Sequence, residues 1–326
     1  MLSATTGADP LTRIIMLGTG DFALPTFLAL LDAGEAVVAL VTQPDRPQGR
    51  KQELIPSRIK RAALDRGVPV EQPEDVNDPP AVEHLKTYRP DLLVTAAYGQ
   101  ILSAALLSVP TLGGINLHGS ILPSYRGAAP VARAIADGLD ETGVTVIKMS
   151  PKIDAGGMIA FARTPIGPDE TAGEVEARLA AIGAPLIVGC VGRVAGGTAQ
   201  ILPQDRARIT RAPKLRKEDA PIDWSKAARA VHDHVRALQP WPIASTAWTP
   251  ADPSRPPVRL IVHRSAIDAG HGEPGVVVEA AGDRLVVAAG SGAVRLLSVQ
   301  VPGRKALPAE EFLRGNPVRV GDRLGG

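Results

Sequence analysis

The first 200 residues alternate between short apolar segments and segments with helical spacing, a pattern that few folds can accommodate. The segment 36–42 (AVVALVT) is apolar or β-branched throughout, which is typical of a strand buried on both faces of a sheet. Expected strands cover 14–17, 36–42, 92–96, 114–117 and 143–149, and expected helices cover 24–33, 56–66, 130–137 and 174–189. This alternation favours a doubly wound, mostly parallel sheet, so we predict a Rossmann-like α/β domain.

The sequence changes character after residue 203. Residues 204–221 are polar, basic and marked by prolines, as expected of a linker. A helix is expected to begin at Ser225, which suits an N-cap, and to end near Leu238. Beyond it, β-rich runs cover 258–267, 275–280, 284–290 and 293–301, which is typical of a small barrel or sandwich. We therefore predict a domain at 1–203 that begins with a leader at 1–11, a linker at 204–221 and a second domain at 222–326.

Composition excludes several classes of protein. Of the 326 residues, 44% are apolar and 21% are charged, the balance of an ordinary globular protein. No segment approaches the ~18 uninterrupted apolar residues of a membrane span, and the N-terminus lacks the apolar core of a secretory signal. The single cysteine, Cys190, excludes a disulfide framework and any multi-cysteine metal site. We expect a cytoplasmic protein without a metal or a membrane.

Charge is distributed unevenly along the chain. Residues 1–206 hold 18 Lys and Arg against 22 Asp and Glu, a net charge of −4. Residues 207–326 hold 18 against 12, a net charge of +6. A basic second part suggests a polyanionic partner such as a nucleic acid, although a solvated, Arg-rich surface would have the same composition.

A glycine pattern follows the first expected strand. Gly18 and Gly20 match the turn that binds phosphate in dinucleotide folds. That fold also needs an acid at the end of the second strand, for the ribose hydroxyls. Here the strand ends in Thr42-Gln43-Pro44, and Asp45 lies beyond the proline. The pattern is therefore interpreted first as a plain strand-to-helix turn, with dinucleotide binding as the alternative.

Polar side chains occur where an apolar strand ends. Asn116 and His118 are two positions apart in 114–118 (GINLH), so both lie on one face of the strand. An amide donor beside an imidazole can stabilise a carbonyl oxygen as it becomes an oxyanion. The alternative is a hydrogen-bonded pair that fixes a loop.

One expected strand later, Asp154 lies in a Gly-flanked loop that can reach the same edge of the sheet. A carboxylate near His118 can orient the ring or position a water, whereas an isolated Asp in a loop more often makes a turn. Because no Ser or Cys nucleophile accompanies these residues, they do not form a hydrolase triad. They suit direct group transfer between two bound substrates.

A long basic segment covers 42–61. Arg46, Arg50 and Lys51 could contact phosphates there, and a mobile solvated loop is the alternative.

Several of these segments resemble the formyltransferases that use 10-formyltetrahydrofolate. The resemblance rests on NLHGS at 116–120, SILPSYRGAAP at 120–130 and KIDAGG at 152–157. The basic segment at 42–50, IDWSKAARAVHDHVRALQPWP at 222–242 and VQVPGRKAL at 299–307 are similar to the members that act on charged initiator tRNA. The similarity extends over about residues 12–323.

The resemblance implies a donor, an acceptor and site residues. The donor would be 10-formyltetrahydrofolate, the acceptor would be the methionyl amine of initiator tRNA, and the second domain would be an OB-like barrel that holds the tRNA. No metal and no obligate protein partner are implied. Asn116, His118 and Asp154 align with the catalytic residues of the family. We assign folate binding to Ser120, Ile121, Leu122, Pro123, Tyr98 and Gly99, and tRNA binding to Arg46, Arg50, Lys51, Arg304 and Lys305.

The chain departs from the family pattern at two positions. Glu53 makes the basic segment less positive than in many members, and Ala132 replaces a polar residue. A folate-dependent enzyme could formylate another amine, such as a glycinamide ribonucleotide or an amino sugar nucleotide, although it would not need a basic second domain. A nicotinamide-dependent oxidoreductase would need the missing ribose-binding acid. A non-catalytic RNA-binding protein would have no use for Asn116 and His118 at a strand end.

Overall fold

The computed structural model of the chain describes residues 11–48, 53–252, 254 and 256–325. The described residues form two compact units. The first comprises those within Met1–Gly127, Gly143–Thr164 and Glu176–Arg211, and the second those within Ala128–Thr142, Pro165–Val175 and Ala212–Gly326.

The first unit is built on a seven-stranded sheet with the order β10-β9-β7-β6-β1-β2-β5. Its strands are β1 (Arg13–Gly18), β2 (Ala36–Val41), β5 (Val70–Glu71), β6 (Leu92–Ala96), β7 (Gly114–His118), β9 (Glu141–Lys148) and β10 (Met158–Pro165). β1 pairs in parallel with both β2 and β6, and β6 pairs in parallel with β7, whereas β9 runs antiparallel to β7. The predicted Rossmann-like, mostly parallel sheet is confirmed.

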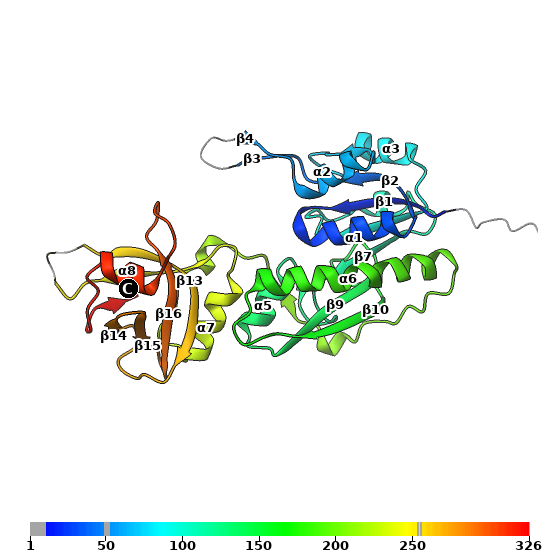
Figure 1. The fold of residues 1–326 in the computed structure, drawn as a ribbon. Helices are drawn as coiled ribbons and strands as arrows, with labels where there is room; N and C mark the ends of the chain where they lie inside the picture. The colour runs from blue at the N-terminus through cyan, green and yellow to red at the C-terminus, as the bar shows by residue number, and fades with distance from the viewer. Residues whose placement is uncertain (1–10, 49–52, 253, 255, 326) are drawn as a thin grey trace, which may run out of the picture. The chain divides into compact units, whose positions relative to one another are not determined.

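Helices and a hairpin complete the α/β architecture (Figure 1). The helices are α1 (Gly20–Asp32), α2 (Arg58–Asp65), α3 (Pro79–Thr87), α4 (Ala104–Leu107) and α6 (Ala172–Ala195), whose first turn lies in the second unit. Two short pairs of strands join them, β3 (Pro47–Gln48) with β4 (Glu53–Leu54), and β8 (Arg126–Gly127) with β11 (Arg211–Ala212). In Figure 1, β3 and β4 form an arm that extends away from α2.

The sheet changes direction at β1. The chain runs from β1 outward to β2 and β5, then returns to the other side of β1 with β6, β7 and β9. In open α/β sheets, such a switch point opens a crevice at the carboxyl ends of the strands. A Cβ on Gly18, at the end of β1, would lie 2.6 Å from Ala23 Cβ and 3.1 Å from the Ala96 carbonyl oxygen. Gly18 therefore permits α1 to pack closely, which supports the structural interpretation of the glycine pattern.

Helix α6 is long and apolar enough to cross a membrane by length and composition, with a mean hydropathy of 1.6. Packing in the first unit accounts for its apolar residues, which are buried at helical spacing at Leu179, Ile187 and Val191. A Cβ on Gly183 would lie 2.5 Å from a methyl carbon of Leu117. The missing side chain at this position lets α6 approach β7 closely.

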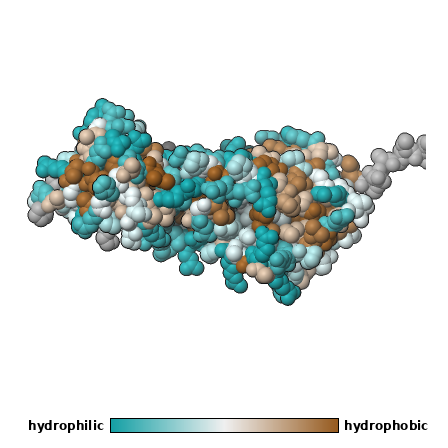
Figure 2. Space-filling model, turned by 90° about the horizontal axis from the view of Figure 1, so that it is seen from below, coloured by the Kyte–Doolittle hydropathy of each residue, from teal (hydrophilic) through white to brown (hydrophobic). Residues whose placement is uncertain are grey.

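On the face in Figure 2, hydrophobic residues lie among hydrophilic ones.

The second unit contains an antiparallel, nearly closed barrel with the order β14-β15-β16-β13-β12-β18, and β17 pairs with β16. Its strands are β12 (Ala244–Thr249), β13 (Val258–Asp268), β14 (Val277–Ala281), β15 (Arg284–Ala288), β16 (Ala293–Gln300), β17 (Leu307–Pro308) and β18 (Arg323–Leu324). The Val277 N–H donates to the Asp322 carbonyl at 2.8 Å, and the Gly321 N–H donates to the Val277 carbonyl at 2.9 Å. These bonds join the two ends of the sheet, so the predicted barrel is confirmed.

Helical segments of the second unit accompany the barrel, namely α5 (Pro130–Ala136), α7 (Ala228–Ala237), α8 (Ala309–Gly315) and the 3-10 turn Lys217–Asp219. The predicted start of α7 at Ser225 is wrong, because the N-cap is Ala227 and its side chain makes no capping bond. The Ser225 hydroxyl instead donates to Asp223 at 2.5 Å. A Cβ on Gly290 would lie 1.9 Å from the Ser225 carbonyl oxygen, so the backbone before the helix packs tightly against this glycine.

Candidate active site

Asn116 and His118 lie on β7 in the first unit, next to β6. The Asn116 side chain is half-buried, and only 6% of His118 is exposed. The Thr95 hydroxyl on β6 donates to Asn116 Oδ1 at 2.6 Å. Because the amide oxygen already has a partner, the Asn116 amide nitrogen is the group left to donate to a ligand.

The hydrogen bond of His118 assigns one of its ring nitrogens. Nε2 lies 2.9 Å from the Tyr125 carbonyl oxygen. A carbonyl oxygen only accepts, so Nε2 carries a proton in either charge state of the ring. Nδ1 is then the nitrogen that can gain or lose a proton during a reaction.

The Asp154 carboxylate faces this second nitrogen. Asp154 Oδ2 lies 3.6 Å from His118 Nδ1 and accepts the Gly127 N–H at 2.8 Å. Asp154 has a backbone φ of +47°, a left-handed conformation that a non-glycine residue adopts rarely. Such strain persists where surrounding contacts hold it, and it is frequent at functional sites.

The geometry brings together an amide donor, a ring that changes its charge at one nitrogen, and a carboxylate. This combination can stabilise an oxyanion and accept a proton from an attacking amine. Among the described residues, no group of three or more His, Cys, Asp or Glu could hold a metal ion.

The four predicted folate residues Ser120–Pro123 form a tight loop directly after β7. The Ser120 hydroxyl donates to the Ser124 carbonyl at 2.6 Å, so this side chain closes the loop. The Thr145 hydroxyl on β9 donates to the Ser120 carbonyl at 2.7 Å and accepts the Leu122 N–H at 3.1 Å. Leu122 is buried and Ile121 is half-buried. This loop is thus held rigidly beside His118.

Tyr98 and Gly99 follow β6 at the switch point. The Tyr98 ring is buried in the hydrophobic core, and burial strongly raises the pKa of its hydroxyl. Its backbone carbonyl accepts from Thr19 Oγ1 at 3.3 Å and from Gln43 Nε2 at 3.2 Å. Gly99 is exposed with a φ of +95°. Tyr98 is therefore largely occupied by the core and by these bonds, whereas Gly99 is exposed.

The predicted tRNA-binding residues lie in both units. Arg46 is exposed at the base of the β3–β4 arm and pairs with Glu74 at 2.5 Å. Arg50 and Lys51 lie outside the described residues. Arg304 and Lys305 are exposed between β16 and β17 in the second unit.

Sequence reasoning missed Gln204, which it placed in a linker. Gln204 Oε1 accepts from Arg126 Nε and Nη2 at 3.0 and 2.7 Å. Gln204 Nε2 donates to the Asp154 and Gly156 carbonyls, both at 2.7 Å. These contacts join residues 48 to 78 positions apart, so no local pattern could have indicated them.

The segment after Gln204 runs next to the loop that holds His118. The Tyr125 N–H donates to Thr210 Oγ1 at 2.8 Å, and the Arg126 N–H donates to the Thr210 carbonyl at 3.0 Å. Exposed basic side chains follow at Arg206, Arg208, Arg211, Lys214, Arg216 and Lys217. Within the described part of the chain, none of these six cations forms an ion pair. These six side chains are therefore not held by a carboxylate within the described residues.

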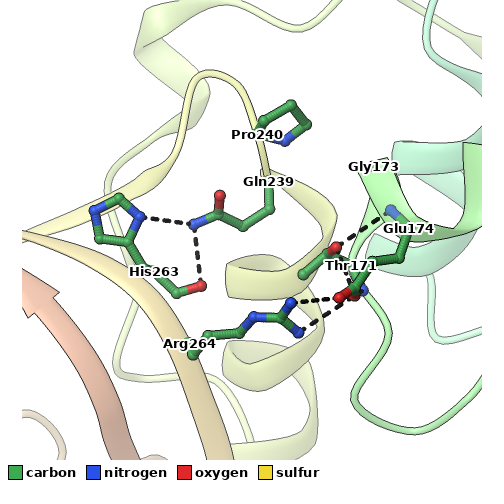
Figure 3. Close-up of a pocket in the computed structure, with 7 residues that line it drawn as sticks. All are labelled: Thr171, Gly173, Glu174, Gln239, Pro240, His263 and Arg264. Atoms are coloured by element: carbon green, nitrogen blue, oxygen red, sulfur yellow. Dashed lines mark hydrogen bonds and ion pairs between the residues drawn. The ribbon is translucent and has the colours of Figure 1, made fainter. Parts of the chain in front are cut away.

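A separate hollow of about 300 Å³ lies in the second unit (Figure 3). It is lined by Thr171, Gly173, Glu174, Gln239, Pro240, His263 and Arg264. Its polar side chains bond to one another, with Gln239 donating to the His263 carbonyl at 3.0 Å. Hydrogen bonding from Arg264 lowers the pKa of the Glu174 carboxyl to about 2. This hollow is internally satisfied, so we do not assign a ligand to it.

Comparison with known proteins defines the class to which this fold and site belong. Residues 12–191 match the family described as "Formyl transferase", and residues 214–317 match "Formyl transferase, C-terminal domain". The chain belongs to the formyl transferase family. It is 42% identical over 315 residues to a methionyl-tRNA formyltransferase of Moorella thermoacetica, covering 96% of this chain and 99% of that one. It is 40% identical over 319 residues to a methionyl-tRNA formyltransferase of Geobacillus thermodenitrificans, covering 97% and 98%.

Solved structures share the fold. WlaRD, a sugar 3N-formyl transferase whose structure was solved in the presence of dTDP and 5-N-formyl-THF, aligns with a TM-score of 0.65 at 15% identity. That alignment covers 91% of this chain and all of the other. HypX from Aquifex aeolicus, solved in complex with tetrahydrofolic acid, aligns with a TM-score of 0.62 at 16% identity. The alignment covers 93% of this chain but only 47% of HypX.

Proposed function

We propose that the protein transfers the formyl group of 10-formyltetrahydrofolate to the amino group of methionyl-initiator tRNA, giving N-formylmethionyl-tRNA for translation initiation. One observation carries the proposal. Asn116 and His118 lie at the end of β7, with His118 Nδ1 3.6 Å from Asp154 Oδ2, in a chain that aligns with methionyl-tRNA formyltransferases over nearly its whole length. Translation initiation implies a cytoplasmic enzyme.

The proposed reaction begins when the neutral methionyl amine attacks the formyl carbon. A new C–N bond forms, and the carbonyl oxygen becomes an oxyanion that the Asn116 amide stabilises. His118 begins as a neutral ring, becomes charged as Nδ1 takes up the amine proton, and then also stabilises the oxyanion. The amine proton leaves through His118 Nδ1 or a water held by Asp154. It is delivered to the departing folate nitrogen as the old C–N bond breaks. The products are formyl-methionyl-tRNA and tetrahydrofolate.

Two features support a folate site beside these residues. The Ser120–Pro123 loop is rigid because Thr145 fixes two of its backbone groups. The switch point between β1 and β6 opens at the same edge of the sheet, next to Gly99. We therefore assign the pterin-bearing substrate to this edge, between the Ser120–Pro123 loop and the end of β6.

The charge distribution supports a tRNA acceptor. Exposed cations lie on the β3–β4 arm at Arg46 and between β16 and β17 at Arg304 and Lys305. The six cations of 206–217 that form no ion pair within the described residues flank Thr210, which accepts a hydrogen bond from the Tyr125 N–H. Aromatic residues make up only 3% of the chain, which suits contacts with phosphates rather than stacking on unpaired bases.

The direct test offers several acceptors in parallel. Radiolabelled 10-formyltetrahydrofolate is incubated with the protein and with charged initiator tRNA, uncharged tRNA or glycinamide ribonucleotide. We expect label on the charged tRNA alone. Label on the small amine alone would keep the chemistry and overturn the acceptor. Release of formate without any transfer would replace the transferase by a hydrolase.

The role of Asn116 has its own test. Loss of one preorganised oxyanion donor typically lowers kcat by about 10²–10³ fold, so we expect that loss in Asn116→Ala with an unchanged tRNA affinity. Asn316→Ala is the matched control, because among the described residues the Asn316 side-chain amide bonds to the Phe312 carbonyl at the end of α8, outside the unit that holds the candidate active site. Near-wild-type turnover of Asn116→Ala would remove Asn116 from the proposed mechanism.

A further inference from the structure

Three consecutive residues after the Ser120–Pro123 loop each hold a different part of the candidate active site. The Tyr125 carbonyl accepts from His118 Nε2 at 2.9 Å. The Gly127 N–H donates to the Asp154 carboxylate at 2.8 Å. Between them, the Arg126 guanidinium donates twice to Gln204 Oε1. The relative position of His118 and Asp154 therefore depends on how the 125–127 segment is fixed to the loop that carries Asp154.

Gln204 joins that segment to the Asp154 loop. Its Nε2 donates to the Asp154 carbonyl and to the Gly156 carbonyl, both at 2.7 Å. One amide group thus bridges two loops that come from different parts of the sheet. All four side-chain hydrogen bonds of Gln204 are made within the first unit.

The backbone of Asp154 needs such a restraint. Its φ of +47° is unfavourable for a residue with a Cβ. The Gln204 amide binds the carbonyl of this same residue, so it holds the conformation that directs the carboxylate toward Gly127 and His118. The loop is also confined on its other side, because a Cβ on Gly156 would lie 1.6 Å from the Lys148 carbonyl oxygen.

We infer that Gln204 is a positioning residue for formyl transfer, which keeps the Asp154 carboxylate beside His118 Nδ1 by binding the Asp154 and Gly156 carbonyls. Gln204 has no contact with His118 or with the Asp154 carboxylate in the described structure, and it acts through the loop backbone. This inference rests on the proposed function, since it assigns Asp154 a role in turnover.

Gln204→Glu tests the inference because it removes the two hydrogen bonds from Nε2 to the Asp154 and Gly156 carbonyls. The new carboxylate still accepts from Arg126, but it cannot donate to the two carbonyls and repels them. Misplacement of a catalytic group by about 1 Å costs on the order of 10²-fold in rate. We expect kcat to fall by about that factor, with KM for folate and for tRNA within about twofold of wild type. Gln200→Glu is the matched control, since Gln200 is exposed and carries the same change four positions earlier.

A second measurement does not use activity. Hydrogen exchange of the Gly127 amide reports on its bond to Asp154, and we expect about tenfold faster exchange in Gln204→Glu than in wild type or Gln200→Glu. Unchanged exchange together with kcat within about twofold of wild type would overturn the inference. A fall in melting temperature matched by general loss of amide protection would also overturn it, because Gln204 would then serve only stability. If wild type fails to formylate any acceptor, the proposed function fails, while the Gly127 exchange still decides the role of Gln204.

Discussion

Replacement of Asp154 by Asn removes one charge from the candidate active site and preserves the shape of the side chain. In the wild-type structure, the Gly127 N–H donates to the Asp154 carboxylate at 2.8 Å. The amide oxygen of the variant can still accept this hydrogen bond. The variant loses the attraction between the carboxylate and positive charge on His118, whose Nδ1 is 3.6 Å away. At this separation, two unit charges attract by about 4.6 kcal/mol with an effective dielectric constant of about 20. If the ring becomes fully charged only in the transition state, the rate falls by up to about 10³ fold.

We therefore expect kcat of Asp154→Asn to be about 10²–10³ fold below wild type, with both KM values nearly unchanged. Single-turnover formyl transfer at saturating folate and charged tRNA measures this step without product release. Asp169→Asn is the control, because Asp169 lies 3.4 Å from His232 in a second His–Asp pair, where 74% of the Asp169 side chain is exposed. A rate for Asp154→Asn within about threefold of wild type would refute the electrostatic argument.

Three further predictions concern stability and binding. In Gly156→Ala, the new Cβ would lie 1.6 Å from the Lys148 carbonyl oxygen, so urea unfolding should show a free energy of unfolding lower by about 1–3 kcal/mol or more. Gly315→Ala is the control, because Gly315 has open space around it and its free energy of unfolding should stay within about 1 kcal/mol of wild type. The pKa of Glu174 is lowered from 4.5 to about 2 in the folded protein, so its contribution is complete above pH 4.5 and is lost as the pH falls toward 2. Because 48% of this side chain is exposed, we expect Glu174→Gln to cost only about 1 kcal/mol at pH 7, and a difference that does not shrink toward pH 2 in urea unfolding would contradict the argument. Arg46→Ala should weaken tRNA binding and reduce the slope of log K against log salt by about 1, and an unchanged slope would exclude a phosphate contact at this residue.

Local patterns were enough to predict much of the fold. The segment 92–96 is a strand with the bounds expected from its apolar run, and α5 begins at Pro130 as predicted. Elements with weaker patterns were not predicted, such as β10 and β12. In β10 only Thr164 is buried, because this strand forms the edge of its sheet. An edge strand therefore lacks the apolar run that identifies a central strand.

The sequence by itself was enough to predict Asn116 and His118 as site residues, because their types and spacing are local properties of one strand. It also indicated Asp154, from its Gly-flanked loop after a later strand and from a resemblance whose motifs are short. Only the tertiary structure decided which atoms face one another, since Nε2 of His118 is bound by the Tyr125 carbonyl and Nδ1 alone faces Asp154. The same holds for Gln204, whose partners are up to 78 positions away. Hydrogen bonds between residues so far apart in the sequence arise from the packing of strands and loops. Periodicity along the chain carries no information about them.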